Sequence, residues 1–276
     1  MRILLLYYSG AGNTKFIANL IEKTLLKENH VVKSIRKTEK SISTLDNDFD
    51  VLILGFPIIF RNAPELVYKS LENLSGEKRS ILVFFTKGLY SGNTFKLIHE
   101  RAVKKGFSVK GFLNLYMFGM DLLTYVIISG TFIEKLYLKV YSKNIYSKIK
   151  KFLDKMHEGR EIKKVYTKWY TFFDELVVKP LEIKADNKHK DWIKGFNTNE
   201  NLCIQCMKCV EGCPRSNIEY KGKITFGHTC DVCLFCINNC PKMAINIYTK
   251  TINKVKISEE RINKIFENEL RRQNVT

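Results

Sequence analysis

Cysteine is absent from the first part of this 276-residue chain, and all eight cysteines fall between Cys203 and Cys240. A disulfide scaffold requires an oxidising, secreted setting. No signal peptide is visible, because the apolar run from Ile3 to Tyr8 is short and is followed at once by glycine and small polar residues. We therefore expect a cytoplasmic protein with reduced, metal-binding cysteines.

Acidic residues are few: 28 Asp and Glu face 46 Lys and Arg, which gives a formal net charge of +18. One interpretation is docking on acidic redox partner proteins, and the other is a lysine-rich composition without functional meaning. Nucleic-acid binding is disfavoured, because no recognised motif accompanies the charge. The apolar stretch from Gly111 to Ile133 contains Asn114, Asp121 and Gly130, so we expect no membrane span.

Short apolar segments alternate with amphipathic ones near the N-terminus. The predicted strands are Ile3–Tyr8, Val31–Ile35, Val51–Leu54, Ile81–Phe85 and Phe112–Met117. The predicted helices are Thr14–Leu26, Pro64–Leu71 and Thr94–Val103. Strands that alternate with helices form a parallel sheet with right-handed crossovers. The sequence therefore predicts an α/β fold with a doubly wound, five-stranded parallel sheet.

The segment 121–195 is rich in lysine and aromatic residues and is interpreted as a helical insert or connector. Its aromatic residues recur at helical spacing at Tyr166, Trp169, Tyr170 and Phe173. They form either an aromatic path for electrons or, as we prefer, the apolar face of a packed helix. A further amphipathic helix is predicted over Ser258–Arg272, within the last segment, 251–276.

The cysteines form an internal repeat of two copies, and each copy has the pattern C-x2-C-x2-C-x3-C-P. The second copy lies 27 residues after the first. The first copy contains Cys203, Cys206, Cys209, Cys213 and Pro214, and the second contains Cys230, Cys233, Cys236, Cys240 and Pro241. Three cysteines at these spacings can surround one face of an iron–sulfur cube, with each thiolate on a different iron. Zinc ribbons use two C-x2-C pairs and need neither the third cysteine nor the proline.

This module, residues 196–250, resembles the bacterial two-cluster ferredoxins, in which the fourth cysteine of each copy binds the other cluster. The resemblance implies one 4Fe-4S cluster on Cys203, Cys206, Cys209 and Cys240. It implies a second 4Fe-4S cluster on Cys230, Cys233, Cys236 and Cys213. All eight cysteines are then used, which disfavours radical chemistry that needs an open iron. Such ferredoxins are usually acidic, whereas this module is basic.

A glycine-containing loop follows the first predicted strand and precedes a helix. It consists of Ser9, Gly10, Ala11, Gly12, Asn13 and Thr14. Backbone amides and the positive end of a helix bind phosphate, and glycines let the backbone approach closely. No lysine is present, which separates the loop from a Walker loop. The alternative interpretation is a tight strand-to-helix turn.

The loop resembles the flavodoxin pattern S/T-x-T-G-N-T, with Ala11 in place of the usual threonine, and residues 1–120 resemble a flavodoxin-like domain. The resemblance implies FMN, with its ring held between two later loops. The first contains Pro57, Ile58, Ile59 and Phe60, and the second contains Thr86, Lys87, Gly88, Leu89 and Tyr90. Phe60 and Tyr90 are the candidate stacking residues, with core packing as the alternative for Phe60. Lys87 is a candidate for stabilising a reduced, anionic flavin.

The whole chain resembles a fusion of a flavodoxin-like domain with a two-cluster ferredoxin. We expect an electron carrier that relays electrons among the clusters, FMN and outside redox partners, with no acid–base catalytic residue. The second hypothesis is a flavin-dependent reductase of a small substrate that uses the clusters as its electron input. The third is an iron–sulfur redox sensor or interaction protein with an empty flavin loop.

Overall fold

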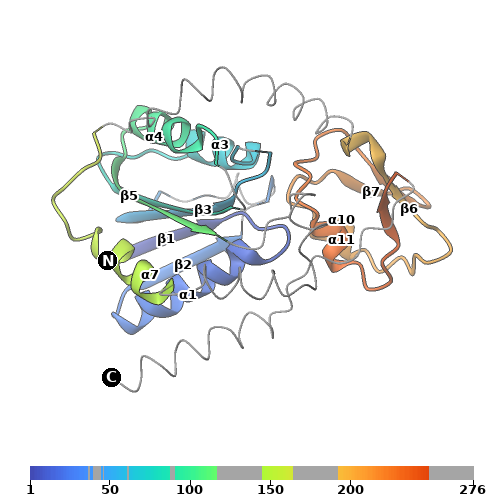
Figure 1. Cartoon of the computed structure of the whole chain (residues 1–276), viewed down its shortest axis with the longest axis horizontal. Helices are drawn as coiled ribbons and strands as arrows, with labels where there is room; N and C mark the ends of the chain where they lie inside the picture. The colour runs from blue at the N-terminus through green and yellow to red at the C-terminus, as the bar shows by residue number, and fades with distance from the viewer. Residues whose placement is uncertain are drawn as a thin grey trace.

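The computed structural model describes residues 1–36, 38–39, 45, 47–60, 62–87, 91–116, 145–163 and 192–248 (Figure 1). Several predictions lie outside these residues. They are the loop positions Gly88, Leu89 and Tyr90, the aromatic stripe from Tyr166 to Phe173, the helix Ser258–Arg272, most of the stretch from Gly111 to Ile133, and the domain boundaries near 120 and 250.

The N-terminal part contains a five-stranded, wholly parallel sheet. Its strands are β1 (Arg2–Tyr7), β2 (Val31–Arg36), β3 (Val51–Pro57), β4 (Ser80–Lys87) and β5 (Ser108–Tyr116). Their order in the sheet is β2-β1-β3-β4-β5, which is the doubly wound order of flavodoxins. All five predicted strands are present. Strand β5 begins four residues before the predicted Phe112, and this first part lacks a continuous apolar run because partly exposed positions alternate with buried ones.

Helices cover both faces of this sheet (Figure 1). Side chains of α1 (Asn13–Lys27) and α7 (Ile145–Asp154) form one core with β1, β3 and β4. Side chains of α3 (Glu65–Glu72) and α4 (Thr94–Lys104) form the second core on the other face. Helix α7 belongs to the segment interpreted as a helical insert. Because both faces are covered, the central strands are almost entirely apolar.

The C-terminal module, residues 192–248, contains short elements around a core of its own. Strand β6 (Phe196–Thr198) pairs with β9 (Ile245–Ile247), and β7 (Ile218–Tyr220) pairs with β8 (Ile224–Phe226), both antiparallel. Helices α10 (Lys208–Glu211) and α11 (Phe235–Asn239) each follow the middle of a cysteine motif.

The C-terminal module lies beside the carboxyl-terminal edge of the parallel sheet (Figure 1). Ligands of doubly wound proteins bind at this edge, outside the ends of the strands. The fold therefore brings the glycine loop after β1 and the cysteine motifs to the same region. Among the described residues, no helix combines the length and the apolar composition that crossing a membrane requires.

Candidate functional site

The glycine loop turns the chain from β1 into α1. Gly12 caps the helix with a left-handed φ of 102°, and a Cβ added there would meet nothing within 4 Å. The amide of Phe16 donates to the Gly12 carbonyl at 2.9 Å, which begins the helical ladder. The first amides of a helix have no partner within the helix. Gly12 thus leaves open space next to a helix end that can bind a phosphate.

Hydroxyl groups tie this loop to its neighbours. The hydroxyls of Thr14 and Thr86 are buried and lie 2.8 Å apart, which joins the start of α1 to the end of β4. The Ser9 hydroxyl accepts from the amide of Lys15 at 3.2 Å. Ser9, Thr14 and Thr86, all predicted site residues, therefore lie close together across two strands.

The predicted loop after β3 is a tight turn. The amide of Ile58 donates to the Thr86 carbonyl at 2.8 Å, and Ile59 and Asn62 exchange backbone hydrogen bonds. Phe60 has a left-handed φ of 46°. Its ring contacts that of Trp192, edge to face, with the centroids 6.1 Å apart. The structure thus places Phe60 against the C-terminal module, and its stacking on a flavin ring stays a prediction.

Lys87 ends β4 at the same edge of the sheet. Its ammonium lies 4.7 Å from the centroid of the Tyr116 ring, and burial lowers its pKa. A partly desolvated ammonium stabilises a nearby negative charge more strongly than a hydrated one does. This environment suits the predicted role beside a reduced flavin.

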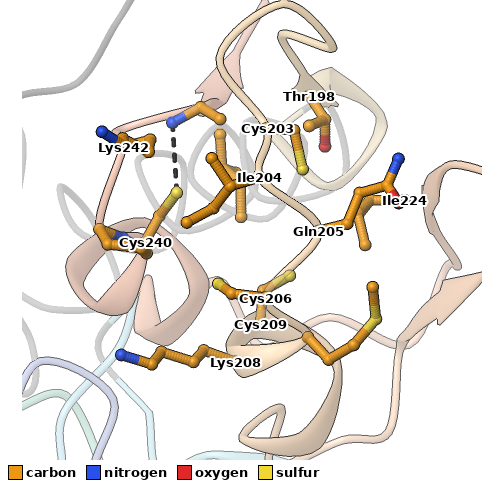
Figure 2. Close-up of a pocket in the computed structure, with 14 residues that line it drawn as sticks. Thr198, Cys203, Ile204, Gln205, Cys206, Lys208, Cys209, Ile224, Cys240 and Lys242 are labelled. Atoms are coloured by element: carbon orange, nitrogen blue, oxygen red, sulfur yellow. Dashed lines mark hydrogen bonds between the residues drawn. The ribbon is translucent and has the colours of Figure 1, made fainter.

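The eight cysteines are free thiols that form two groups. The first group lines one pocket and contains Cys203, Cys206, Cys209 and Cys240 (Figure 2). Cys206 is exposed, and Lys208 and Lys242 also line the pocket. The Cys240 sulfur accepts a hydrogen bond from the amide of Ala244 at 3.2 Å, drawn as a dashed line in Figure 2. The fourth cysteine of the second motif therefore lies with the first three of the other motif.

The second group contains Cys230, Cys233, Cys236 and Cys213, and it is the more deeply buried one. Burial raises the pKa of Cys230 to about 12 and that of Cys233 to about 11, and it raises the pKa of Cys236 well above its usual value. A nearby Cys213 disfavours the charged form of each of these three thiols. Cys213 therefore lies with the cysteines of the second motif.

The backbone of the module repeats as its sequence does. Left-handed residues occur in pairs separated by 27 positions: Gln205 and Val232, Met207 and Leu234, Ser216 and Met243. None is glycine, and this conformation costs a non-glycine residue about 1–2 kcal/mol. Alternating right- and left-handed residues turn successive amides inward and form nests that bind anions, including iron–sulfur clusters. Two equivalent loops are therefore shaped around the two cysteine groups.

Among the described residues, no three His, Cys, Asp or Glu side chains converge closely enough to bind a single metal ion. The cysteine groups are looser arrangements, with one group open to solvent and the other enclosed. The structure therefore brings the predicted ligands together in sets of four without forming a site for one ion.

Charged side chains join the second cysteine group to the N-terminal part. The Arg215 side chain is 4% exposed and lies 2.9 Å from carboxylate oxygens of both Glu39 and Glu65, and 3.8 Å from Asp231. Its Nε donates to the carbonyl of Thr229 at 3.0 Å. The buried Arg215 thus pairs with carboxylates from both parts of the chain, and its removal would leave them without their cation.

Arg36, at the end of β2, makes a second connection. Its guanidinium donates to the carbonyls of Ser9 and Gly212, the latter at 3.1 Å, and lies 4.3 Å from the centroid of the Phe235 ring. It therefore contacts the predicted phosphate loop and both copies of the cysteine repeat.

Tyr8 and Gly10 make the most direct contact between the two predicted cofactor sites. The fully buried Tyr8 hydroxyl donates to the Asp231 carboxylate at 3.2 Å. The Tyr8 side chain packs in the same buried cluster as Cys233, and its hydroxyl opposes the effect of burial on the pKa of that thiol. A Cβ on Gly10 would lie 2.0 Å from the Cys233 carbonyl oxygen. A residue of the phosphate loop thus packs on the backbone of a predicted cluster ligand.

Known proteins resemble the N-terminal part. Residues 4–111 match the family model described as "Flavodoxin domain". This part of the chain is a flavodoxin domain. The match ends before the C-terminal module, and no curated protein sequence matches the chain.

Solved structures resemble the chain at low identity. Flavodoxin 2 from Bacillus cereus is 22% identical, with a TM-score of 0.42 over 58% of this chain and 100% of that chain. A flavodoxin from the domain Archaea is 18% identical, with a TM-score of 0.33 over 52% and 98%. A flavoprotein from Lactobacillus acidophilus, solved in complex with FMN, is 19% identical, with a TM-score of 0.33 over 41% and 92%. The flavodoxin-like fold is therefore assigned from the strand order and the family match.

Sequence reasoning did not identify the residues that join the flavodoxin domain to the C-terminal module. They are Tyr8, Arg36, Glu39, Glu65, Arg215 and Asp231. They come from separate elements, and no spacing pattern links them. One signal was available: Asp231 is acidic, whereas its counterpart in the other copy of the repeat, Ile204, is apolar.

Proposed function

We propose that this chain is a cytoplasmic electron-transfer protein with FMN in its flavodoxin domain and two 4Fe-4S clusters in its C-terminal module. The first cluster would be held by Cys203, Cys206, Cys209 and Cys240. The second would be held by Cys230, Cys233, Cys236 and Cys213. Such clusters exchange one electron at a time, whereas a flavin exchanges one or two.

The residues at each site fit these groups. Thiolates on a cube bind four different irons, so they need not converge as the ligands of a single ion do. Backbone amides donate to cysteine sulfurs in both groups, that of Ala244 to Cys240 and that of Val232 to Cys230, each at 3.2 Å. At the flavin site, the open space at Gly12 and the buried pair of Thr14 and Thr86 suit a phosphate at the start of α1.

The observation that carries the proposal is the contact of Gly10 with Cys233. It places a predicted ligand of the second cluster directly on the predicted phosphate loop. The first cysteine group, with the exposed Cys206, opens to solvent instead. We therefore expect outside partners to meet the first group, while the second faces the flavin. Lys208 and Lys242 beside the first group favour an acidic partner.

Composition and electron flow test this function together. The full-length chain is purified without air and analysed for iron, sulfide and flavin, and we expect about eight irons, eight sulfides and one flavin per chain. The loaded protein is then mixed with a low-potential reductant in a stopped-flow instrument, and the cluster and flavin absorbance are followed. Flavin reduction should follow cluster reduction rapidly and independently of protein concentration. Zinc in place of iron, or a flavin that titrates independently of the clusters, would refute the relay.

A further inference from the structure

The flavodoxin domain supplies a side chain to the surroundings of the second cysteine group. Tyr8 follows β1, and its amide continues the ladder by donating to the Gly55 carbonyl at 2.8 Å. This backbone bond fixes the residue, and the side chain is fully buried beneath the loop that carries Cys233. The hydroxyl is therefore held at the junction by the sheet itself.

Two groups compete for the single proton of this hydroxyl. One is the Asp231 carboxylate at 3.2 Å, and the other is the Cys233 sulfur, which belongs to the same cluster of buried side chains as Tyr8. A distance of 3.2 Å is long for a hydroxyl that donates to a carboxylate, since about 2.6 Å is usual. The Asp231 carboxylate also has Arg215 as a cationic neighbour, at 3.8 Å. The hydroxyl is therefore not committed to Asp231 and can turn to a stronger acceptor.

Cluster binding would create that acceptor, because a cysteine ligand is a thiolate. Hydrogen bonds to the sulfurs of a cluster stabilise its reduced, more negative state and raise its reduction potential. We propose that the Tyr8 hydroxyl donates to the Cys233 sulfur and thereby raises the reduction potential of the second cluster above the value that its own module would give it. This inference rests on the proposed function and adds to it a tuning residue from the flavodoxin domain.

The consequence is a built-in difference between two otherwise equivalent clusters. The corresponding sulfur of the first group belongs to Cys206, which is exposed. With a raised potential, the second cluster would accept electrons from the first and hold them next to the flavin domain. Tyr8 would therefore favour inward electron flow.

The test compares Tyr8→Phe with Tyr7→Phe in the full-length, cluster-loaded protein. Both substitutions remove one oxygen from a buried tyrosine of the same segment, but Tyr7 packs in the core on the opposite face of the sheet. Each protein is first analysed for iron and sulfide and then titrated without air while the reduced clusters are followed by electron paramagnetic resonance.

We expect one of the two cluster midpoints to fall in Tyr8→Phe and neither to move in Tyr7→Phe. Loss of a charge-assisted hydrogen bond should lower the ratio of reduced to oxidised second cluster about tenfold at a fixed potential, or about 59 mV for a one-electron couple. A fluorotyrosine incorporated at position 8 is a stronger donor of nearly the same shape and should move the same midpoint upward.

Unchanged midpoints in both position-8 proteins with full iron content would overturn the role of Tyr8 and leave the proposed function standing. A shift of equal size in Tyr7→Phe would also overturn it, because the effect would then be structural. Wild-type protein without iron and sulfide would instead refute the proposed function, and the inference with it.

Discussion

Loss of the Arg215 side chain should separate the C-terminal module from the flavodoxin domain. In Arg215→Met, the carboxylates of Glu39, Glu65 and Asp231 would face one another without their cation. Removing one partner of a buried ion pair costs about 3–5 kcal/mol. The Glu65 side chain is 59% exposed and can turn to water, so we expect the lower end, about 3 kcal/mol. That free energy corresponds to roughly a 150-fold rise in the equilibrium constant for opening the contact.

Hydrogen exchange at a single amide measures this opening. The amide of Glu39 donates to the carbonyl of Pro214 at 2.7 Å, so the bond spans the two parts of the chain. Its exchange should become about 150-fold faster in Arg215→Met, while the amide of Ile53 in the centre of β3 should keep its protection. Adding Asp231→Asn should slow the exchange again, because it removes the most buried of the unpaired charges.

A matched control removes an exposed cation from the same module. Lys221 lies 2.6 Å from Glu219, and both side chains are exposed, so Lys221→Met should leave the Glu39 amide unaffected. If the Glu39 amide exchanged at similar rates in Arg215→Met and Lys221→Met, the buried ion cluster would not be what holds the two parts together.

Three further experiments test neighbouring parts of the molecule. Gly10→Ala places a Cβ 2.0 Å from the Cys233 carbonyl oxygen, so it should speed hydrogen exchange of the Glu39 amide and slow flavin reduction in stopped-flow traces. The control is Gly159→Ala, whose Cβ would meet nothing within 4 Å. Equal behaviour of the two variants would contradict this prediction. Thr86→Val leaves the buried Thr14 hydroxyl without its partner at 2.8 Å, so it should lower the free energy of unfolding by about 1–3 kcal/mol and lower the melting temperature. The control Thr225→Val removes an exposed hydrogen bond and should leave the melting temperature unchanged. Equal melting temperatures of the two variants would argue against the hydroxyl pair. Cys206→Ser and Cys233→Ser should each lose about half of the iron, from different clusters, and a complete loss of iron in Cys206→Ser would show that the two groups do not load independently.

The sequence was sufficient for the flavodoxin domain because its signals are local. Strands β1, β3 and β4 are buried on both faces, so each is a continuous apolar run. Strand β5 was predicted too short, because its first residues include Ser108 and Lys110 and alternate between buried and partly exposed positions. The glycine loop and the cysteine spacing are likewise contained in short segments, and their positions were readable without any knowledge of packing.

The junction between the two parts was not predictable from local patterns. Tyr8 and Asp231 are 223 positions apart, and Arg215 and Glu65 are 150 positions apart. Charged residues at such separations have no periodicity that marks them as partners. Phe60 illustrates the same limit, because no local pattern around this residue marks Trp192 as its neighbour.

The internal repeat nevertheless contains information about this junction. The counterpart of Arg215 in the other copy is Lys242, and the counterpart of Asp231 is Ile204. Arg215 and Asp231 are buried against the flavodoxin domain, whereas Ile204 is 56% exposed and lines the pocket of the first cysteine group together with Lys242. The two copies of the cysteine repeat need the same residue at a given position only where that position has the same surroundings in both copies. The positions at which the two copies differ therefore mark the copy that faces the flavodoxin domain. They distinguish an inner cluster, next to that domain, from an outer cluster that faces solvent in the proposed relay.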